Sequence, residues 1–217
     1  MNTRTRAART VGAAMLAGLA AVSVAACGSD DEQPAGPAAA EQAPDPAAAP
    51  EQVTWQKSGP VSLPVSTTSG PKVTTPAPSG FEQSGPGAGL AAVHAAVRIA
   101  VAPDGQWTQV VKAMVAPGPG RDAFMVNRAQ LENNGAETND DMIPVVRGWV
   151  MQDYSPERAQ VQVITEYSDG SLLGTEETVI WRDGDWKLVI PEPESTENPQ
   201  TALEQLPENM TVVEEPA

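Results

Sequence analysis

The sequence predicts an α+β fold in which N-terminal helices pack on one face of a curved, four-stranded antiparallel meander. Three observations lead to this class. Between residues 86 and 133, apolar side chains recur at steps of three and four, as in helices. From residue 142 to residue 190 the period changes to two, which indicates strands. Two turn sequences, Ser168-Asp169-Gly170-Ser171 and Asp183-Gly184, divide this second part into hairpins.

Three helices are expected. The first, residues 86–102, begins at a proline and stops before Pro103, and its apolar face includes Leu90, Val93, Val97 and Val101. The second, residues 107–116, stops at a Pro-Gly-Pro-Gly run. The third, residues 121–133, is closed by an Asn-Asn-Gly sequence.

Four strands follow. The first runs from residue 142 to 152, and the second ends near Tyr167. The third spans residues 172–182 and the fourth spans residues 185–190, where Trp186, Leu188 and Ile190 share one face. Two prolines after Ile190 end the meander.

The N-terminus carries the clearest functional signal. Three arginines precede an uncharged, apolar run from Val11 to Ala26, which fits a secretory signal peptide over residues 1–26. The run ends in Val24-Ala25-Ala26-Cys27, which resembles the lipobox of bacterial lipoproteins. This resemblance implies that Cys27 receives a lipid and becomes the new N-terminus. The alternative is an ordinary secreted protein with a chance cysteine near its cleavage site.

Charge and composition divide the rest of the chain. Its 217 residues include 13 basic and 28 acidic side chains, and the acidic excess is concentrated in two flanks. Residues 27–52 are expected to be a disordered, acidic Ala/Pro-rich tether and residues 192–217 a disordered acidic tail, apart from one weak helical turn near residues 201–206. Residues 53–85 are expected to be an irregular extended arm that is either docked on the domain through Trp55 and Phe81 or disordered. No basic footprint for nucleic acid is present.

The ending Val179-Ile180-Trp181-Arg182-Asp183-Gly184-Asp185-Trp186-Lys187-Leu188 is similar to the closing hairpin of NTF2-like (cystatin-like) domains. This resemblance covers residues 86–191 and implies a cone-shaped α+β domain. A narrower resemblance is to lipoproteins of actinobacterial integrative and conjugative elements. It rests on Trp55, Leu63-Pro64-Val65-Ser66, Gly70-Pro71, Gly80-Phe81 and Gly87-Ala88, followed by an alanine-rich helix.

Few residues suggest chemistry. His94, the single histidine, is either a general base at the edge of a cavity or a structural residue of the first helix. Asp140-Asp141 is expected to be a solvated turn. Asp153-Tyr154 and Glu166-Tyr167 are expected to meet across adjacent strands, either as rim residues or as a tyrosine–carboxylate site. The tryptophans Trp149, Trp181 and Trp186 are expected to pack in the core and in the closing hairpin, with an exposed aromatic patch as the alternative. The composition, with a single cysteine and a single histidine, argues against a transition-metal site, which needs several converging ligands.

The sequence therefore predicts a non-enzymatic interaction module, lipid-anchored through Cys27 on the extracytoplasmic face of the cell membrane, without a cofactor or a metal. Its expected partners are the membrane and other envelope proteins, and one candidate role is as an accessory of a conjugative transfer apparatus. The alternative function is a small-molecule binder or isomerase-like protein that uses the cavity of the cone. A third possibility is that the acidic flanks capture cations or basic cell-wall partners.

Overall fold

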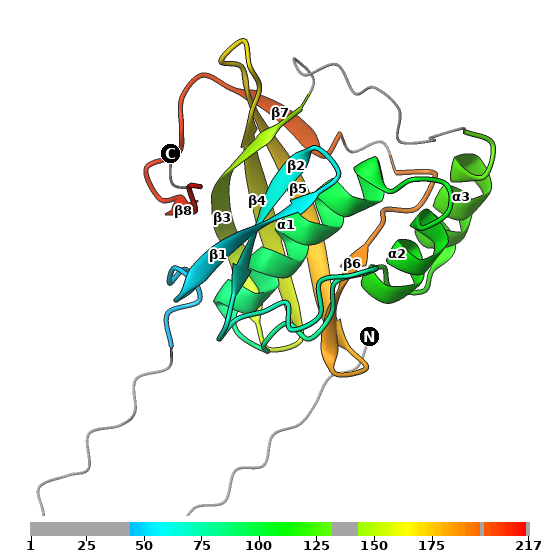
Figure 1. Cartoon of the computed structure of the whole chain (residues 1–217), viewed down its shortest axis with the longest axis horizontal. Helices are drawn as coiled ribbons and strands as arrows, with labels where there is room; N and C mark the ends of the chain where they lie inside the picture. The colour runs from blue at the N-terminus through cyan, green and yellow to red at the C-terminus, as the bar shows by residue number, and fades with distance from the viewer. Residues whose placement is uncertain (1–43, 132–142, 196–197, 216–217) are drawn as a thin grey trace, which may run out of the picture. The chain divides into compact units, whose positions relative to one another are not determined.

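The computed structural model describes residues 44–131, 143–195 and 198–215, and all of them belong to one unit that spans residues 42–217. A hairpin comes first in the chain, three helices follow, and a meander with two short further strands completes the unit (Figure 1). The helices are α1 (Gly85–Val101), α2 (Trp107–Met114) and α3 (Pro119–Arg128). The strands are β1 (Val53–Ser58), β2 (Val61–Ser66), β3 (Val145–Ser155), β4 (Arg158–Glu166), β5 (Leu172–Arg182), β6 (Asp185–Val189), β7 (Gln200–Leu203) and β8 (Thr211–Val212).

The predicted α+β class, with three helices followed by an antiparallel meander, is confirmed. Strands β3 to β6 pair in chain order, and the main sheet has the order β6-β5-β4-β3-β8, with β7 paired to β5. The β5–β6 turn uses positive φ at both Asp183 (55°) and Gly184 (77°), which suits the right-handed twist of a two-residue hairpin. The β3–β4 register shifts at two places, between Val146 and Gly148 and between Met151 and Asp153. Such bulges bend a strand and add to the twist of the sheet.

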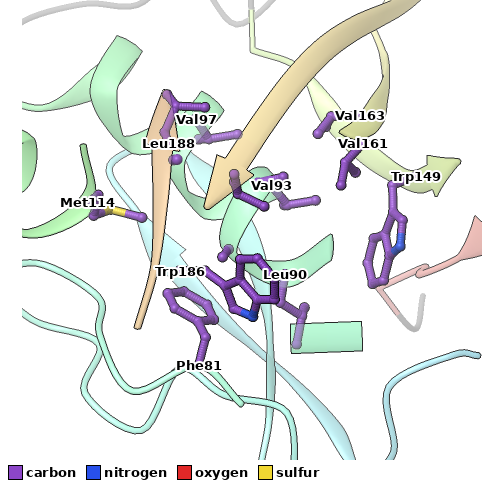
Figure 2. Close-up of a cluster of buried hydrophobic side chains, with 14 of the residues drawn as sticks. Phe81, Leu90, Val93, Val97, Met114, Trp149, Val161, Val163, Trp186 and Leu188 are labelled. Atoms are coloured by element: carbon purple, nitrogen blue, oxygen red, sulfur yellow. The ribbon is translucent and has the colours of Figure 1, made fainter. Parts of the chain in front are cut away.

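Helix α1 lies against one face of this sheet and supplies much of the core (Figure 1). It begins at Ser84, whose hydroxyl accepts a hydrogen bond from the backbone N–H of Gly87 at 3.2 Å, and Pro86 occupies its first turn. Figure 2 shows its apolar residues facing those of the strands. Buried members of this cluster are Leu90, Val93, Val97, Met114, Trp149, Val161, Val163, Val179, Trp186 and Leu188. Trp149 and Trp186 are therefore core residues, as expected.

The arm, residues 53–85, is docked on the helices and the main sheet, so the first of the two alternatives for this segment is correct. Strands β1 and β2 form a separate two-stranded sheet, in which Trp55 pairs with Pro64. Val61, Leu63 and Phe81 are buried in the core, whereas Trp55 is only partly buried. The expectation of an irregular arm was wrong in this respect. A proline is tolerated in a strand at a sheet edge, and a two-stranded sheet consists of edges only.

The described parts of both acidic flanks are also ordered, which corrects the expectation of disorder for these residues. Residues 44–52 reach the domain, because Ser66 Oγ donates a hydrogen bond to the carbonyl oxygen of Glu51 at 2.6 Å. In the tail, β7 pairs with β5 and β8 pairs with β3. The weak helical turn expected near residues 201–206 is therefore wrong, since β7 occupies residues 200–203.

Two further expectations concern residues that the structure does not describe. They are the lipidation of Cys27, with the signal peptide before it, and the Asp140-Asp141 turn. Within the described part of the chain, no helix is both long enough and apolar enough to cross a membrane.

Candidate functional site

A cavity of about 330 Å³ lies between the C-terminal half of α1 and the sheet. We call it the α1 cavity. The helix contributes small and apolar side chains, the strands contribute apolar side chains together with threonines, and one carboxyl group belongs to the lining. The lining residues are Ala96, Val97, Ala100, Val101, Pro144, Val163, Thr165, Tyr167, Leu173, Thr175, Glu177 and Gln200.

The alternation of β5 directs Glu177 into this cavity. Residues directly opposite each other in an antiparallel pair project to the same face of the sheet. Glu177 is opposite Val161, which is buried in the core that packs against α1, and Thr175 is opposite Val163. The carboxyl of Glu177 therefore lies on the inner face, whereas its neighbour Glu176 lies on the outer face and accepts a hydrogen bond from Gln162 Nε2 at 2.8 Å.

Glu177 also lies where the edge of β5 has no strand beside it. Strand β6 pairs with β5 from Thr178 onward, and β7 pairs with it up to Thr175. Between them, the backbone N–H of Glu176 donates a hydrogen bond to the carbonyl oxygen of Pro199 at 2.7 Å. A second cavity of about 370 Å³ lies at this gap, and Glu177 belongs to the lining of both cavities.

The environment of Glu177 favours its neutral form. Burial, assisted by the negative charge of Glu176, raises the pKa of the Glu177 carboxyl from 4.5 to about 8. Among the described residues, no hydrogen bond or ion pair engages this carboxyl. At neutral pH most molecules therefore carry a protonated Glu177. This carboxyl can donate a hydrogen bond into the cavity, or it can transfer its proton to a bound neutral base and form an ion pair with the cation that results.

His94 lies in the core and does not belong to the lining of the α1 cavity. Its side chain is fully buried, its Nε2 donates a hydrogen bond to the carbonyl oxygen of Pro64 at 2.8 Å, and its ring contacts Phe81 edge-on. Burial and the nearby charge of Arg98 lower the pKa of His94 to about 3, although the bond to Pro64 acts in the opposite direction. His94 therefore joins α1 to the docked arm as a neutral ring, which is the structural role considered from the sequence.

The two tyrosine–carboxylate couples do not meet, so this expectation was wrong. Asp153 pairs with Gln160 near the β3–β4 turn, whereas Glu166 pairs with Val145 at the far end of the same hairpin. Only residues at equal distance from the turn face each other in an antiparallel pair. Tyr154 packs on Trp186, with ring centroids 6.2 Å apart, and Glu166 forms an ion pair with Arg147 at 2.6 Å.

Tyr167 was considered from the sequence as part of one of these couples, and it does line the α1 cavity together with Glu177. Glu177 itself was missed. The sequence did contain a signal for it. Thr175, Glu177 and Val179 are alternate residues of one strand and share its inward face, where a carboxylate is unusual.

Trp181 is partly buried and packs on Trp186 with the ring centroids 5.5 Å apart, which places it in the closing hairpin as expected. The described residues contain no group of three His, Cys, Asp or Glu side chains that could hold a metal ion.

Residues 17–210 match a domain of unknown function, DUF8175, so the match includes Cys27, the arm, the helices and the meander. No curated protein and no solved structure matches the chain. Because the matched segment covers most of the 217 residues, the chain belongs to the DUF8175 family.

Proposed function

We propose that this chain is a lipid-anchored binding protein on the extracytoplasmic face of the cell membrane, and that it holds a small, largely apolar amine in the α1 cavity. The observation that carries the binding role is the position of Glu177. A carboxyl group without a partner among the described residues faces a cavity with mostly apolar walls. The membrane address rests on the resemblance of Val24 to Cys27 to a lipobox.

The size and the chemistry of the cavity select the ligand class. Small-molecule sites generally enclose about 300–1,000 Å³, and the α1 cavity of about 330 Å³ lies at the lower end of this range. Its walls favour a hydrocarbon body. A buried carboxylate is stable only when it is paired, so a protonated amine would supply the missing partner of Glu177.

A binding role agrees better with these contacts than a catalytic role does. His94, the candidate general base, is fully buried against Pro64 and Phe81 and does not belong to this lining. Glu177 and Tyr167 do belong to it, and their contacts with apolar walls suit the orientation of a bound molecule. We further propose that the packing of α1 on the curved meander is an NTF2-like cone, filled at one end by Trp149 and Trp186 and hollow at the other.

Because of the unpaired Glu177 carboxyl in the α1 cavity, we place small-molecule binding above the protein-interaction function that the sequence alone favours. The interaction module is the second candidate, and exposed apolar side chains at α3 support it. Val126 is 63% exposed and Leu131, just beyond the helix, is 64% exposed. A role as an accessory of a conjugative apparatus belongs to this candidate. It predicts that tagged protein from solubilised envelopes co-purifies with specific envelope proteins, and that Val126→Asp abolishes this.

The cavity is tested with two probes of the same shape, benzylamine and benzyl alcohol, titrated into the full chain in detergent and followed by amide chemical shifts. We expect benzylamine to bind at least about tenfold more tightly than the alcohol, because a buried charge-assisted pair contributes more than 1.4 kcal/mol. Glu177→Gln should remove this preference.

Two further variants separate cavity binding from adhesion to the surface. Ala100→Phe fills the α1 cavity from an exposed helix position and should weaken both probes, whereas Ala129→Phe adds the same ring at an exposed position outside the lining. Equal binding of both probes to all these proteins, or no binding at all, would contradict the proposal.

A further inference from the structure

A second buried charged side chain, the cation Arg98, also lacks a partner among the described residues. Arg98 belongs to the last turn of α1, and only 6% of its surface is exposed. No described residue forms an ion pair or a hydrogen bond with its side chain, and its Nε is shielded from solvent without a partner. Burial lowers the pKa of Arg98, as expected for a cation without a compensating charge.

A cavity of about 260 Å³ adjoins this arginine. It is lined by Arg98 together with Ser58 and Gly59 of the β1–β2 turn and by Gln106 just before α2. An adjoining cavity of about 440 Å³ shares these four residues and adds Lys57. The hydroxyl of Ser58 and the side-chain amide of Gln106 add hydrogen-bond donors to the two cations.

Neither cavity has a carboxylate in its lining, although the chain has a net charge of −15. Asp104, the acidic residue nearest to Arg98 in the sequence, forms an ion pair with Arg128 at 2.9 Å. A positive charge near a helix C-terminus is favourable, which explains an arginine in this turn. It does not explain burial of the charge, since an exposed arginine would interact with the helix end at a smaller desolvation cost.

We propose that Arg98 and Lys57 form a binding site for a phosphate group, between the β1–β2 turn and the C-terminal end of α1. The planar guanidinium can hold two oxygens of one phosphate, and the lysine ammonium supplies a second positive charge. Two cations without a carboxylate match a phosphate monoester, which has a charge of about −1.5 to −2 at pH 7. The charged groups of the two sites differ, because Glu177 does not belong to the lining of either cavity at Arg98, although Val101 borders both the 260 Å³ cavity and the α1 cavity.

The test measures the melting temperature of the full chain in detergent during titration with inorganic phosphate, at constant ionic strength maintained with chloride. A ligand that binds only the folded state raises the melting temperature in a saturable manner. We expect this rise for the unmodified chain, a decrease of at least about tenfold in phosphate affinity for Arg98→Met, and a smaller decrease for Lys57→Met. Arg182→Met, which removes an arginine from an exposed part of the β5–β6 hairpin, should leave the affinity unchanged.

The unliganded variants separate a binding role from a structural one. If Arg98 is held for a ligand, Arg98→Met should melt at or above the temperature of the unmodified chain without phosphate, because an unpaired buried charge has been removed. If Arg98→Met does not fold, Arg98→Lys replaces it in the test, because lysine keeps the positive charge but lacks the planar guanidinium. A decrease in the phosphate affinity of Arg98→Lys would then show that Arg98 binds the phosphate. A phosphate response that is absent, does not saturate, or is equal in the unmodified chain and the Arg98 variants would overturn the proposal.

Further probes identify the source of the phosphate. Glycerol 3-phosphate should act like inorganic phosphate, and acetate, with a single charge, should act more weakly. Phosphatidylcholine vesicles with and without phosphatidic acid, whose headgroup is a phosphate monoester, test a lipid source. If the phosphatidic acid vesicles respond in an Arg98-dependent manner in addition to inorganic phosphate, the phosphate belongs to the membrane; a response to soluble phosphates alone assigns the site to a soluble ester.

Discussion

The backbone N–H of Phe81 donates a hydrogen bond to Oδ1 of Asp185 at 3.0 Å, and this bond fastens the arm to the hairpin that closes the meander. The backbone N–H of Gly80 donates to the other carboxylate oxygen at 3.1 Å. One residue further on, the indole N–H of Trp186 donates to the carbonyl oxygen of Glu82 at 2.8 Å. The Asp-Trp pair of the closing hairpin thus holds three consecutive residues of a segment about a hundred positions away in the sequence.

Replacing Asp185 should loosen this attachment. Asp185→Ala removes the acceptor of the backbone N–H groups of Gly80 and Phe81. It also removes the charge partner of Lys187, whose ammonium lies 3.3 Å from Oδ2 and keeps its hydrogen bond to the carbonyl oxygen of Ala113. We expect the free energy of unfolding to fall by about 2–4 kcal/mol, because each orphaned buried donor costs about 1–3 kcal/mol. Urea denaturation would measure this loss. Asp183→Asn, in the same turn but exposed and tolerant of positive φ, is the control and should change stability by less than about 0.5 kcal/mol.

The close approach of α1 to β3 gives a second prediction. A Cβ atom at Gly89 would collide with the indole ring of Trp149, which is itself fully buried. Gly89→Ala should therefore destabilise the fold by about 1–3 kcal/mol, despite the better helix propensity of alanine. The same substitution at Gly105, where nothing lies within 4 Å of the added atom, serves as the control in thermal melts. Equal melting temperatures for the two variants would contradict the packing described here.

Sequence patterns were sufficient for the helices and the meander because both depend on local periodicity and turn chemistry. The change of period near residue 142 and the Asp183-Gly184 turn appear as β3 to β6 in nearly the expected places. The arm–hairpin attachment could not be predicted in this way. A single aspartate between a turn glycine and a tryptophan gives no indication that its acceptor oxygens meet the backbone of residues 80 and 81.

The ordered tail could not be predicted from composition, because its order depends on the free edges of the sheet. An acidic segment with few aromatic residues is typical of disorder, yet pairing to a strand edge uses backbone groups that every residue except proline offers in full. The free edges of β5 and β3 accept β7 and β8. Val213, the residue after β8, is 4% exposed and belongs to the core cluster.

Docking of the tail can be tested with two neighbouring valines. Val213→Asp places a charge in the core and should cost about 2–4 kcal/mol of unfolding free energy. Val212 is 54% exposed, so Val212→Asp should have an effect of less than about 0.5 kcal/mol. Denaturant titration of both variants decides the point, since equal effects would mean that the tail is not attached as described.

Glu177 predicts a characteristic pH dependence of stability. Its pKa in the folded chain, about 8, exceeds its ordinary value of 4.5, so the folded state binds this proton more tightly than the unfolded state does. Stability should therefore decrease as the pH rises from about 4.5 to about 8, with a slope of at most about 1.4 kcal/mol per pH unit from this group. Above that window the full loss is present.

Glu177→Gln lacks this slope. We expect the variant to be more stable than the unmodified chain at pH 9 and nearly equal to it at pH 4.5, as measured by the urea midpoint at each pH. Glu192→Gln, at an exposed position, removes the same charge as a control and should follow the unmodified chain. Parallel pH profiles for Glu177→Gln and the unmodified chain would show that the carboxyl is not held in its neutral form.

The proposed membrane address depends on Cys27, and mass spectrometry of the N-terminal peptide of the native protein tests it most directly. We expect a peptide that starts at Cys27 and carries acyl chains on the cysteine, as for a stable anchor with more than one chain. A peptide that retains Met1, or one in which the Cys27 thiol is free, would rule out lipid anchoring at this cysteine.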